Sequence, residues 1–490
     1  MSNTQDIKRV LDMRQSILQG DADRVARQHE LGKQTARERV MKLLDAGSFV
    51  ETDALLSRGG DYAGVVTGYG TVAERPVYLF AQDFTVHGGA MGVQQAAKIL
   101  KVLDLAEKTG APVIALCDSA GVRLDEGAEA MNAYAQVYAK LARMSGVCPV
   151  IAVVLGPAIG AAAYISRLAD ISIMGGKAGT VSVYGAQVMG AASGKTYNDE
   201  TIGGAKVMAE NGGIALTAED EDAAIALAAQ VLDYLPDNNA DDAVIVEGED
   251  DLNRLLPPVA ADDSEGLLAG MADNGAYVEL YPAYGRELRV ALARVGGRSC
   301  GLVVSNAAVN DGELTAAGTA KAARFIRLCD CYSLPVISMI NSKGVAVPAA
   351  GEQVAAMVGV SQLLYACAEA TTAKVSVICG NAIGQSFVAM AGKGSADVTY
   401  AWPGAVISAL TPAAAVQVLY ADELKNGGNR SELEAAYAAD VADGVAAARA
   451  GMIDDVIDPA ETRKQVIYAI EMLASKRASN PPKKHGNMPL

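Results

Sequence analysis

Glycine-containing turns are the parts of this sequence best suited to chemistry. Gly88-Gly89, Gly121-Val122 and Gly160-Ala161 each fall at or near the end of an apolar run that leads into a helical pattern. Side chains are small there, and the first N–H groups of a helix have no acceptor within the helix. Two such donors aimed at one point would form an oxyanion hole and stabilise a developing negative charge. For any single turn, the simpler explanation is that glycine permits a tight turn and close packing of helix on strand.

A duplication extends over both halves of the chain. PVIALCDSAGV begins at Pro112 and aligns with PVISMINSKGV, which begins at Pro335, at an offset of 223 residues. The same offset aligns Lys98 with Lys321. Matches that stay in register over about 100 residues indicate a duplicated domain, because solenoid repeats have much shorter periods.

The second copy repeats the glycine turns of the first. Gly344-Val345 corresponds to Gly121-Val122, and GNAIG, which ends at Gly384, aligns with GPAIG, which ends at Gly160. Ile383-Gly384 and the following Gln385 are therefore the second copy's counterpart of the later turn. Because the same two turns recur about 40 residues apart in both copies, the pattern favours an oxyanion hole over packing alone.

Alternating strands and helices must position these turns. In the first copy, the pattern predicts strands over 77–84, 113–119 and 150–156 and helices over 94–110 and through 131–144. Continuous apolar strands that alternate with helices indicate an α/β fold with a mostly parallel sheet covered on its faces.

Domain boundaries follow from length and composition. A chain of 490 residues fits two domains of about 200–250 residues. The segment LLPPVAADDSEG (255–266) combines prolines with acidic residues and is predicted to be a linker. It would separate an N-terminal domain over 1–254 from a C-terminal domain over 267–490. The first 45 residues are expected to form helices packed outside the first domain.

The charge balance limits the partners. A formal net charge of -16 argues against nucleic acid, because phosphate backbones require a basic surface. A polyanionic ligand would need a local basic cluster. Lys98 and Arg123 lie beside the glycine turns and could contact the phosphates of such a ligand. The alternative is that Arg123 pairs with Asp125 or Glu126.

Several kinds of site are not expected. The three histidines, at positions 29, 87 and 485, form no plausible catalytic triad or metal cluster. Positioned backbone dipoles, with acid/base chemistry supplied by a cofactor, are therefore the predicted means of catalysis. The first residues are charged and contain no apolar signal core, so we expect a cytoplasmic protein.

Longer motifs extend over nearly the whole chain in a consistent order. They are DFTVHGGAMG, DSAGVRLDEG, GPAIGAAAY, ETIGGAKV, KAARFIRLCD, YAWPGAVIS and the terminal KKHGNMPL. Together they resemble the carboxyltransferase subunits of biotin-dependent acyl-CoA carboxylases and decarboxylases, such as propionyl-CoA carboxylase and methylmalonyl-CoA decarboxylase. The resemblance implies two tandem crotonase-like (ClpP/crotonase) ββα-spiral domains, the first for acyl-CoA and the second for biotin.

The resemblance also implies roles for the turns. Gly160 and Ala161, with Gly121-Val122, would hold the thioester oxygen of a short-chain acyl-CoA. Ile383 and Gly384, with Gly344, would hold the ureido oxygen of biotin. The residues implied to complete the binding of acyl-CoA and biotin are Gly88, Gly89, Lys98, Arg123, Val345 and Gln385.

Partners and alternatives follow from the same resemblance. The chain contains no Met-Lys-Met biotin site, so biotin is expected on a separate carrier protein, with a biotin carboxylase or membrane decarboxylase subunits. A homohexamer of two stacked trimers is implied. The second copy reads Asn341-Ser342-Lys343-Gly344-Val345 where the family usually has Asp-Val-Pro-Gly-Phe. Two alternatives therefore stay open: a biotin-independent crotonase-fold malonyl-thioester decarboxylase, and a catalytically silent assembly subunit.

Overall fold

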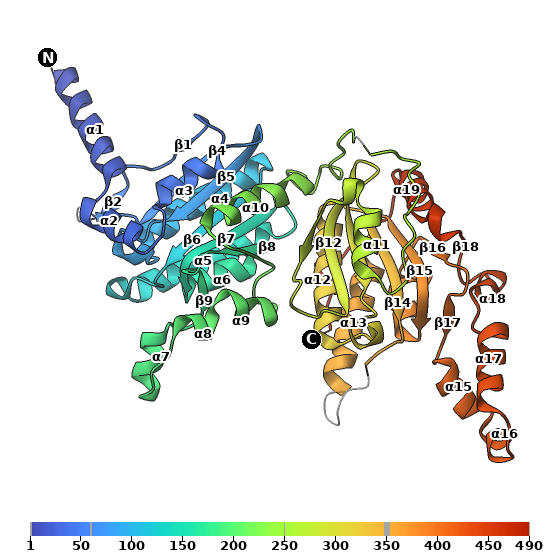
Figure 1. The fold of residues 1–490 in the computed structure, drawn as a ribbon. Coiled ribbons are helices and arrows are strands. Elements are labelled where there is room, and N and C mark those ends of the chain that lie inside the picture. The colour runs from blue at the N-terminus through green and yellow to red at the C-terminus, as the bar shows by residue number, and fades with distance from the viewer. Residues whose placement is uncertain (1, 59–60, 249, 347–352, 490) are drawn as a thin grey trace. The chain divides into compact units, whose positions relative to one another are not determined.

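The chain forms two compact units, residues 1–240 and 241–490, in a computed structural model (Figure 1). The structure describes residues 2–58, 61–248, 250–346 and 353–489. Each unit contains its own sheet and its own buried core. None of the helices in these described ranges is both long and apolar enough to cross a bilayer.

The first unit is built on a mixed sheet of order β1-β4-β5-β6-β7-β8-β10, with β9 beside β7. The strands are β1 (Val50–Glu51), β4 (Val65–Val72), β5 (Arg75–Gln82), β6 (Val113–Ser119), β7 (Val150–Ile159), β8 (Ile171–Gly175), β9 (Thr180–Ser182) and β10 (Leu216–Ala218), with a separate pair β2 (Ser57–Arg58) and β3 (Asp61–Tyr62). The helices are α1 (Ser2–Gln19), α2 (Ala22–Glu30), α3 (Ala36–Leu43), α4 (Val93–Thr109), α5 (Ala128–Met144), α6 (Ala161–Leu168), α7 (Ala186–Ser193), α8 (Asp199–Gly203), α9 (Ala205–Glu210) and α10 (Glu221–Tyr234).

The second unit repeats this arrangement with the order β11-β12-β13-β14-β15-β16-β18 and β17 beside β15. Its strands are β11 (Tyr277–Leu280), β12 (Leu288–Val295), β13 (Arg298–Ser305), β14 (Val336–Ser342), β15 (Lys374–Ile383), β16 (Val398–Ala401), β17 (Val406–Ser408) and β18 (Asp455–Val456). Its helices are α11 (Ser264–Met271), α12 (Ala316–Cys331), α13 (Gln353–Glu369), α14 (Gln385–Met390), α15 (Pro412–Leu419), α16 (Ala421–Lys425), α17 (Arg430–Asp440), α18 (Gly444–Arg449) and α19 (Thr462–Leu473).

The strand register confirms the duplication. Tyr78 pairs with Val113 between β5 and β6, and Gly301 pairs with Val336 between β13 and β14. Both partners in the second pair lie at the offset of 223 residues that the sequence predicted. The central strands β6 and β14 are buried at every position, as continuous apolar runs covered on both faces require.

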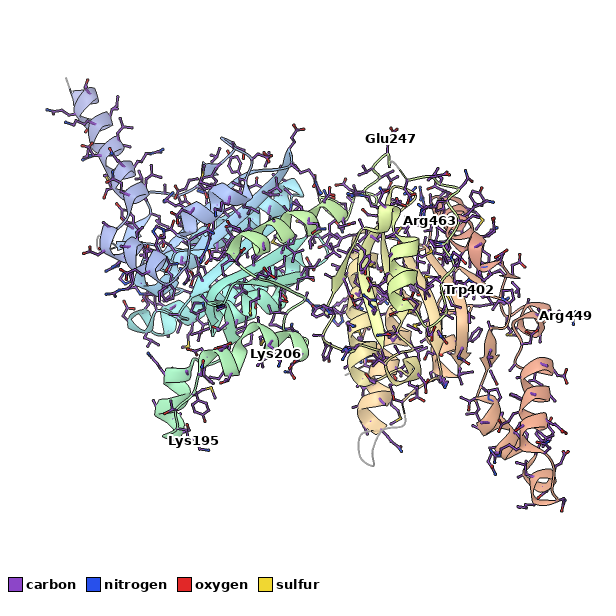
Figure 2. All side chains as sticks on the ribbon, in the orientation of Figure 1. Lys195, Lys206, Glu247, Trp402, Arg449 and Arg463 are labelled. Atoms are coloured by element: carbon purple, nitrogen blue, oxygen red, sulfur yellow. The ribbon has the colours of Figure 1, made fainter. Side chains whose placement is uncertain are left out.

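The last helix, α19, closes the core of the second unit. The indole N–H of Trp402 donates to Thr462 Oγ1 at 2.8 Å. Arg463, labelled with Trp402 in Figure 2, is fully buried, and its guanidinium donates to a carboxylate oxygen of Asp273 at 2.5 Å. A buried charge is tolerated only when it is paired and hydrogen-bonded, so this arginine ties α19 to the segment before β11.

The boundary between the units differs from the predicted one. The first domain was expected to reach residue 254, with a linker over 255–266, but the division falls before Asp241. Ile245 forms an antiparallel bridge with Arg298 of the second unit. Leu256 is 2% exposed and belongs to the same unit's core. Apolar side chains within the proline-rich stretch therefore fold onto the second sheet, and α11 already begins at Ser264.

Candidate active site

The predicted glycine turns of the first unit lie side by side at the carboxyl ends of β5, β6 and β7. The N–H of Met91 donates to the carbonyl of Gly121 at 2.7 Å. A Cβ at Gly89 would lie 2.2 Å from the carbonyl oxygen of Asp118, and one at Gly121 would lie 3.6 Å from that of Ile159. The close approach at Gly89 explains why a glycine is required there. The structure thus brings together the three turns that the sequence singled out.

Two N–H groups at these turns are free. The N–H of Gly121 donates to Ser119 Oγ at 3.2 Å, and that of Gly160 donates to the carbonyl of Ser182 at 2.9 Å. Within the described part of the chain, the N–H groups of Val122 and Ala161 have no acceptor. Ala161 is the first residue of α6, where an unpaired N–H is expected. Val122 and Ala161 therefore offer two free N–H donors at the turns of the first unit.

The second unit presents the same arrangement. The N–H of Gly384 donates to the carbonyl of Ser408 at 2.8 Å, as that of Gly160 does in the first unit. The N–H groups of Val345 and Gln385, among the residues described, have no acceptor. Gly384 has φ 54° and ψ -119°, and Gly160 has φ 54° and ψ -108°. This region is open almost only to glycine.

In the first unit, the free N–H groups belong to Val122 and Ala161, which were among the expected residues. In the second unit, they belong to Val345 and Gln385, one residue after the expected Gly344 and Gly384. The backbone conformation of the turns is set by Gly160, Gly344 and Gly384. The N–H groups of Gly160 and Gly384 are not free, because each donates to a carbonyl of a neighbouring strand. The N–H of Gly344 donates to Ser342 Oγ at 3.3 Å. Ile383 lies inside β15, so it is not at the free end of a helix. Ala161 and Gln385 are each the first residue of a helix, where a free N–H is expected, whereas Val122 and Val345 begin no helix among the described residues.

The two residues that carry the free donors of the second unit line a cavity of about 460 Å³. Val345 and Gln385 line it, together with residues of α13 that include Met357, Val360 and Leu364. The site therefore combines two N–H donors with an aliphatic wall. Such a cavity suits an apolar ring system that carries one hydrogen-bond acceptor.

Lys98 lies beneath a main-chain turn of the first unit. It is 3% exposed, and its ammonium donates to the carbonyl of Val65 at 2.8 Å. Burial lowers the pKa of Lys98 to about 8. Lys321 is likewise buried in the second unit, but it donates to a carbonyl outside the equivalent strand, that of Tyr284 at 2.6 Å. Each lysine therefore bonds main-chain carbonyl groups of its own unit. The expected contact of Lys98 with CoA phosphates stays a prediction.

Arg123 is held by a neighbouring carboxylate. Its guanidinium makes two hydrogen bonds to Asp125, at 2.9 and 2.6 Å. This contact lowers the pKa of Asp125 to about 2. Glu126 and Glu129 line the same cavity of about 380 Å³. The pairing with Asp125 that the sequence left open is therefore present, and Arg123 would have to exchange it to bind a phosphate.

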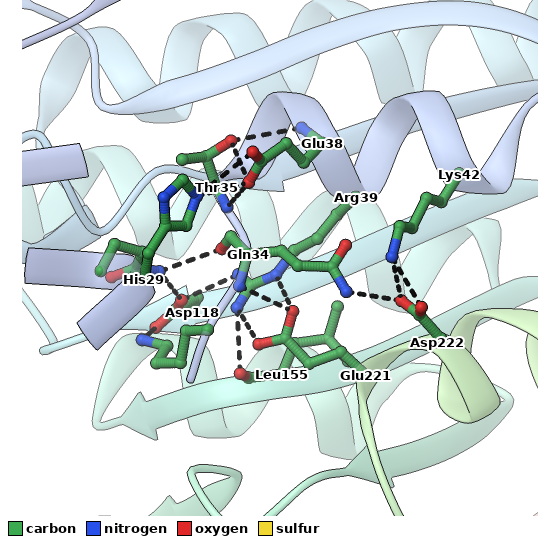
Figure 3. A network of polar contacts seen from close by, with 12 residues as sticks. His29, Gln34, Thr35, Glu38, Arg39, Lys42, Asp118, Leu155, Glu221 and Asp222 are labelled. Carbon is green, nitrogen blue, oxygen red and sulfur yellow. Dashed lines mark hydrogen bonds and ion pairs between the residues drawn. The ribbon is translucent and has the colours of Figure 1, made fainter. Parts of the chain in front are cut away.

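A buried charge network supports the first unit's turns (Figure 3). Asp118, at the end of β6, accepts hydrogen bonds from Lys33 at 2.7 Å, Arg39 at 2.8 Å and Gln28 at 3.2 Å. Arg39 also donates to Glu221 at 2.6 Å. Arg39 and Asp118 are each fully buried. The negative charges of the two carboxylates must therefore be compensated by the positive charges of Lys33 and Arg39. Sequence analysis missed this network and placed the N-terminal helices outside the domain.

Comparisons with known proteins agree along the chain. A family model described as "Carboxyl transferase domain" matches residues 27–488. The methylmalonyl-CoA decarboxylase subunit alpha of Veillonella parvula is 38% identical, with 96% of each chain covered. The methylmalonyl-CoA carboxyltransferase 12S subunit of Propionibacterium freudenreichii subsp. shermanii is 36% identical, over 99% of this chain and 97% of its own.

A solved structure matches the whole fold. Transcarboxylase 12S, described as a hexamer assembly with methylmalonyl-coenzyme A and methylmalonic acid bound, superposes with a TM-score of 0.94 at 35% identity. The match covers 99% of this chain and 98% of that one. The fold of the whole chain, both units included, is thus shared with a protein of known structure.

Proposed function

We propose, since this chain belongs to the carboxyl transferase domain family, that it transfers a carboxyl group between biotin and the α carbon of a short-chain acyl-CoA. It is the carboxyltransferase component of a biotin-dependent carboxylase or decarboxylase. The observation that carries the residue assignment is the recurrence of one donor pair in both units, Val122 with Ala161 and Val345 with Gln385.

In the first unit, the Val122 and Ala161 N–H groups would receive the thioester oxygen of the acyl-CoA. Removal of a proton or a carboxyl group from the α carbon drives negative charge onto that oxygen. Backbone donors fixed by Gly121 and Gly160 stabilise this charge without reorganising, and a single such donor contributes roughly 100- to 1000-fold to the rate. The side chains of these turns supply no base, and the chemistry needs none from them.

In the second unit, the Val345 and Gln385 N–H groups would hold the ureido oxygen of biotin. When bound, biotin supplies a nitrogen that carries the carboxyl group. The residues present fit such a group, because the two donors share a cavity with the aliphatic side chains of Met357, Val360 and Leu364. By drawing electron density onto the oxygen, the donors make the nitrogen a better leaving group.

Assembly and partners extend the proposal. The solved relative is described as a hexamer assembly, and we propose a homohexamer for this chain as well. A separate biotin carrier protein, together with a biotin carboxylase or membrane decarboxylase subunits, would deliver biotin. A cytoplasmic location stays a prediction.

The test is biotin-dependent decarboxylation by the purified chain. We expect methylmalonyl-CoA to lose carbon dioxide when free biotin is added, at a rate that rises with biotin concentration. Decarboxylation that is independent of biotin would favour the malonyl-thioester decarboxylase. No reaction with a panel of carboxyacyl-CoAs would favour a silent assembly subunit.

A further inference from the structure

The first turn of α6 is held by a tyrosine. The Tyr138 hydroxyl, on α5, donates to the carbonyl of Ala161 at 2.9 Å. Tyr138 is half-buried, and burial raises the pKa of its hydroxyl, which keeps it protonated as a donor. The Ala161 carbonyl belongs to the peptide immediately after the one that carries the free N–H. A bond to this carbonyl therefore limits rotation of the donor peptide.

Packing fixes the ring that carries this hydroxyl. The Tyr138 ring lies 5.5 Å from that of Tyr134 and 5.9 Å from that of Tyr164, centroid to centroid. Tyr134 sits one turn earlier on α5, and its hydroxyl makes no bond to α6 in the described residues. Tyr134 thus shares the ring packing of Tyr138 without the hydroxyl contact, and it is a matched control.

The second unit has no tyrosine at this place. The buried positions 130, 133, 137 and 141 of α5 match 356, 359, 363 and 367 of α13. This register aligns Tyr138 with Leu364, which lines the donor cavity and has no hydroxyl.

A serine replaces the tyrosine there. Ser386, on α14, is fully buried, and its hydroxyl donates to the carbonyl of Ile383 at 2.8 Å. That carbonyl belongs to the peptide immediately before the one that carries the Gln385 N–H. The residue aligned with Ser386 in the first unit is Ala162, which has no hydroxyl.

We propose that Tyr138 and Ser386 are positioning residues, each of which sets the direction of one free N–H. Gly160 and Gly384 precede the donors and leave the backbone free to rotate, so each donor peptide needs an anchor. The first unit anchors the peptide on its helical side, and the second anchors it on its strand side. This inference rests on the proposed function, because it concerns the donors assigned to acyl-CoA and biotin.

Tyr138→Phe tests the first anchor. A misdirected donor costs less than a lost one, so we expect kcat for biotin-dependent decarboxylation to fall about tenfold. The KM for methylmalonyl-CoA should change less than about twofold, because the nucleotide end of CoA is bound elsewhere. Tyr134→Phe should leave kcat within about twofold of wild type.

Rescue separates positioning from packing. Ala162→Ser in the Tyr138→Phe background gives the first unit the second unit's anchor, and it should restore most of the lost kcat. Ser386→Ala should lower kcat about tenfold, and Ser386→Thr, which keeps the hydroxyl, should recover it. Thermal unfolding of each variant reports whether the fold is intact.

Two results would overturn the inference while wild type remains biotin-dependent. One is a folded Tyr138→Phe variant whose kcat equals that of wild type. The other is an equal loss in Tyr134→Phe and Tyr138→Phe with no recovery on adding Ala162→Ser. If wild type itself shows no biotin-dependent reaction, the proposed function fails instead.

Discussion

The two units keep the same backbone at their donor turns but support it with different side chains. In the first unit, Asp118 is the last residue but one of β6 and lies in a buried network of charged and polar side chains that reaches α2, α3 and α10. In the second, Asn341 occupies the same position, and its amide donates to the carbonyl of Ala261 at 3.0 Å. It accepts from the N–H of Asn381 at 2.9 Å.

The difference shows which features of the duplication are constrained. A Cβ at Gly156 would meet the Asp118 carboxylate at 2.1 Å, and one at Gly380 would meet the Asn341 amide at 2.5 Å. Both copies thus need a glycine opposite a short polar side chain. The charge of that side chain is free to differ, because each unit has its own partners for it. The main-chain donors are therefore present in both units although the polar side chain beneath them differs in charge.

Gly160→Val and Gly384→Val should have the largest effects. A branched side chain cannot adopt φ 54° without strain, so the following N–H would turn away from its target. We expect kcat to fall about 100- to 1000-fold in each case. Steady-state kinetics combined with titration of a CoA ester should show that Gly160→Val keeps its affinity for the nucleotide portion. Near-normal kcat in a folded variant would make the glycine a packing residue only.

Arg39→Met should be the most destabilising change in the network. It leaves Asp118 and Glu221 buried with one fewer cation, and breaking a buried pair costs about 3–5 kcal/mol. Denaturant unfolding of the intact chain would measure the loss, with Arg37→Met as the control. Arg37 pairs with Glu51 in a less buried position. A loss no greater than that of Arg37→Met would mean that the charges are not essential to the turn.

Asn341→Ala should cost less. It removes a neutral acceptor and donor, which leaves the N–H of Asn381 and the carbonyl of Ala261 without their partner. Both partner residues are only half-buried, so we expect a total loss of about 1–3 kcal/mol. Free energies of unfolding measured for Asn341→Ala and Arg39→Met would show which of the two networks contributes more to stability. If Asn341→Ala proved the more destabilising, the neutral support would be the stronger one.

Replacing Lys98 or Lys321 should change the free energy of unfolding least, and by the same amount in both units. Burial lowers both pKa values to about 8, below the ordinary value of 10.5. The unfolded chain therefore binds more protons between these limits, and stability contributed by each lysine rises as pH increases from about 8 to 10.5. Below pH 8 the buried charge is a constant cost.

Methionine variants would measure this cost. The free energy of unfolding of Lys98→Met or Lys321→Met, relative to that of wild type, should be most favourable at neutral pH. It should fall relative to wild type as the pH rises from about 8 to 10. Unfolding free energies at several pH values supply the test. A difference from wild type that is independent of pH would show that the lysines titrate normally.

The strands could be predicted closely because they are continuous apolar runs. The sequence predicted a strand over 113–119, and β6 is Val113–Ser119. The segment 255–266 was predicted to be a linker because of its prolines and acidic residues. Leu256 within it is nevertheless buried, because tertiary packing decides its burial. Local composition cannot show which core a single leucine joins.

The site was predicted less completely than the fold. The glycine turns, with Val122 and Ala161, were found because their recurrence is visible in the sequence. In the second unit, the free N–H groups belong to the residues after the predicted Gly344 and Gly384. Arg39 and Glu221 are 182 residues apart, and no local pattern links them. The Tyr138 contact likewise depends on how α5 packs against α6, and sequence periodicity does not specify that packing.

Vibrational spectroscopy of bound ligands tests most directly whether each unit polarises its own carbonyl. An acyl-CoA labelled with ¹³C at the thioester carbonyl should show a lower stretching frequency when bound to wild type or to Gly384→Val. The shift should disappear with Gly160→Val. Biotin labelled at its ureido carbonyl should show the reverse, with the shift lost only in Gly384→Val. An unaltered thioester shift in Gly160→Val would contradict the assignment of Val122 and Ala161 as the acyl-CoA donors.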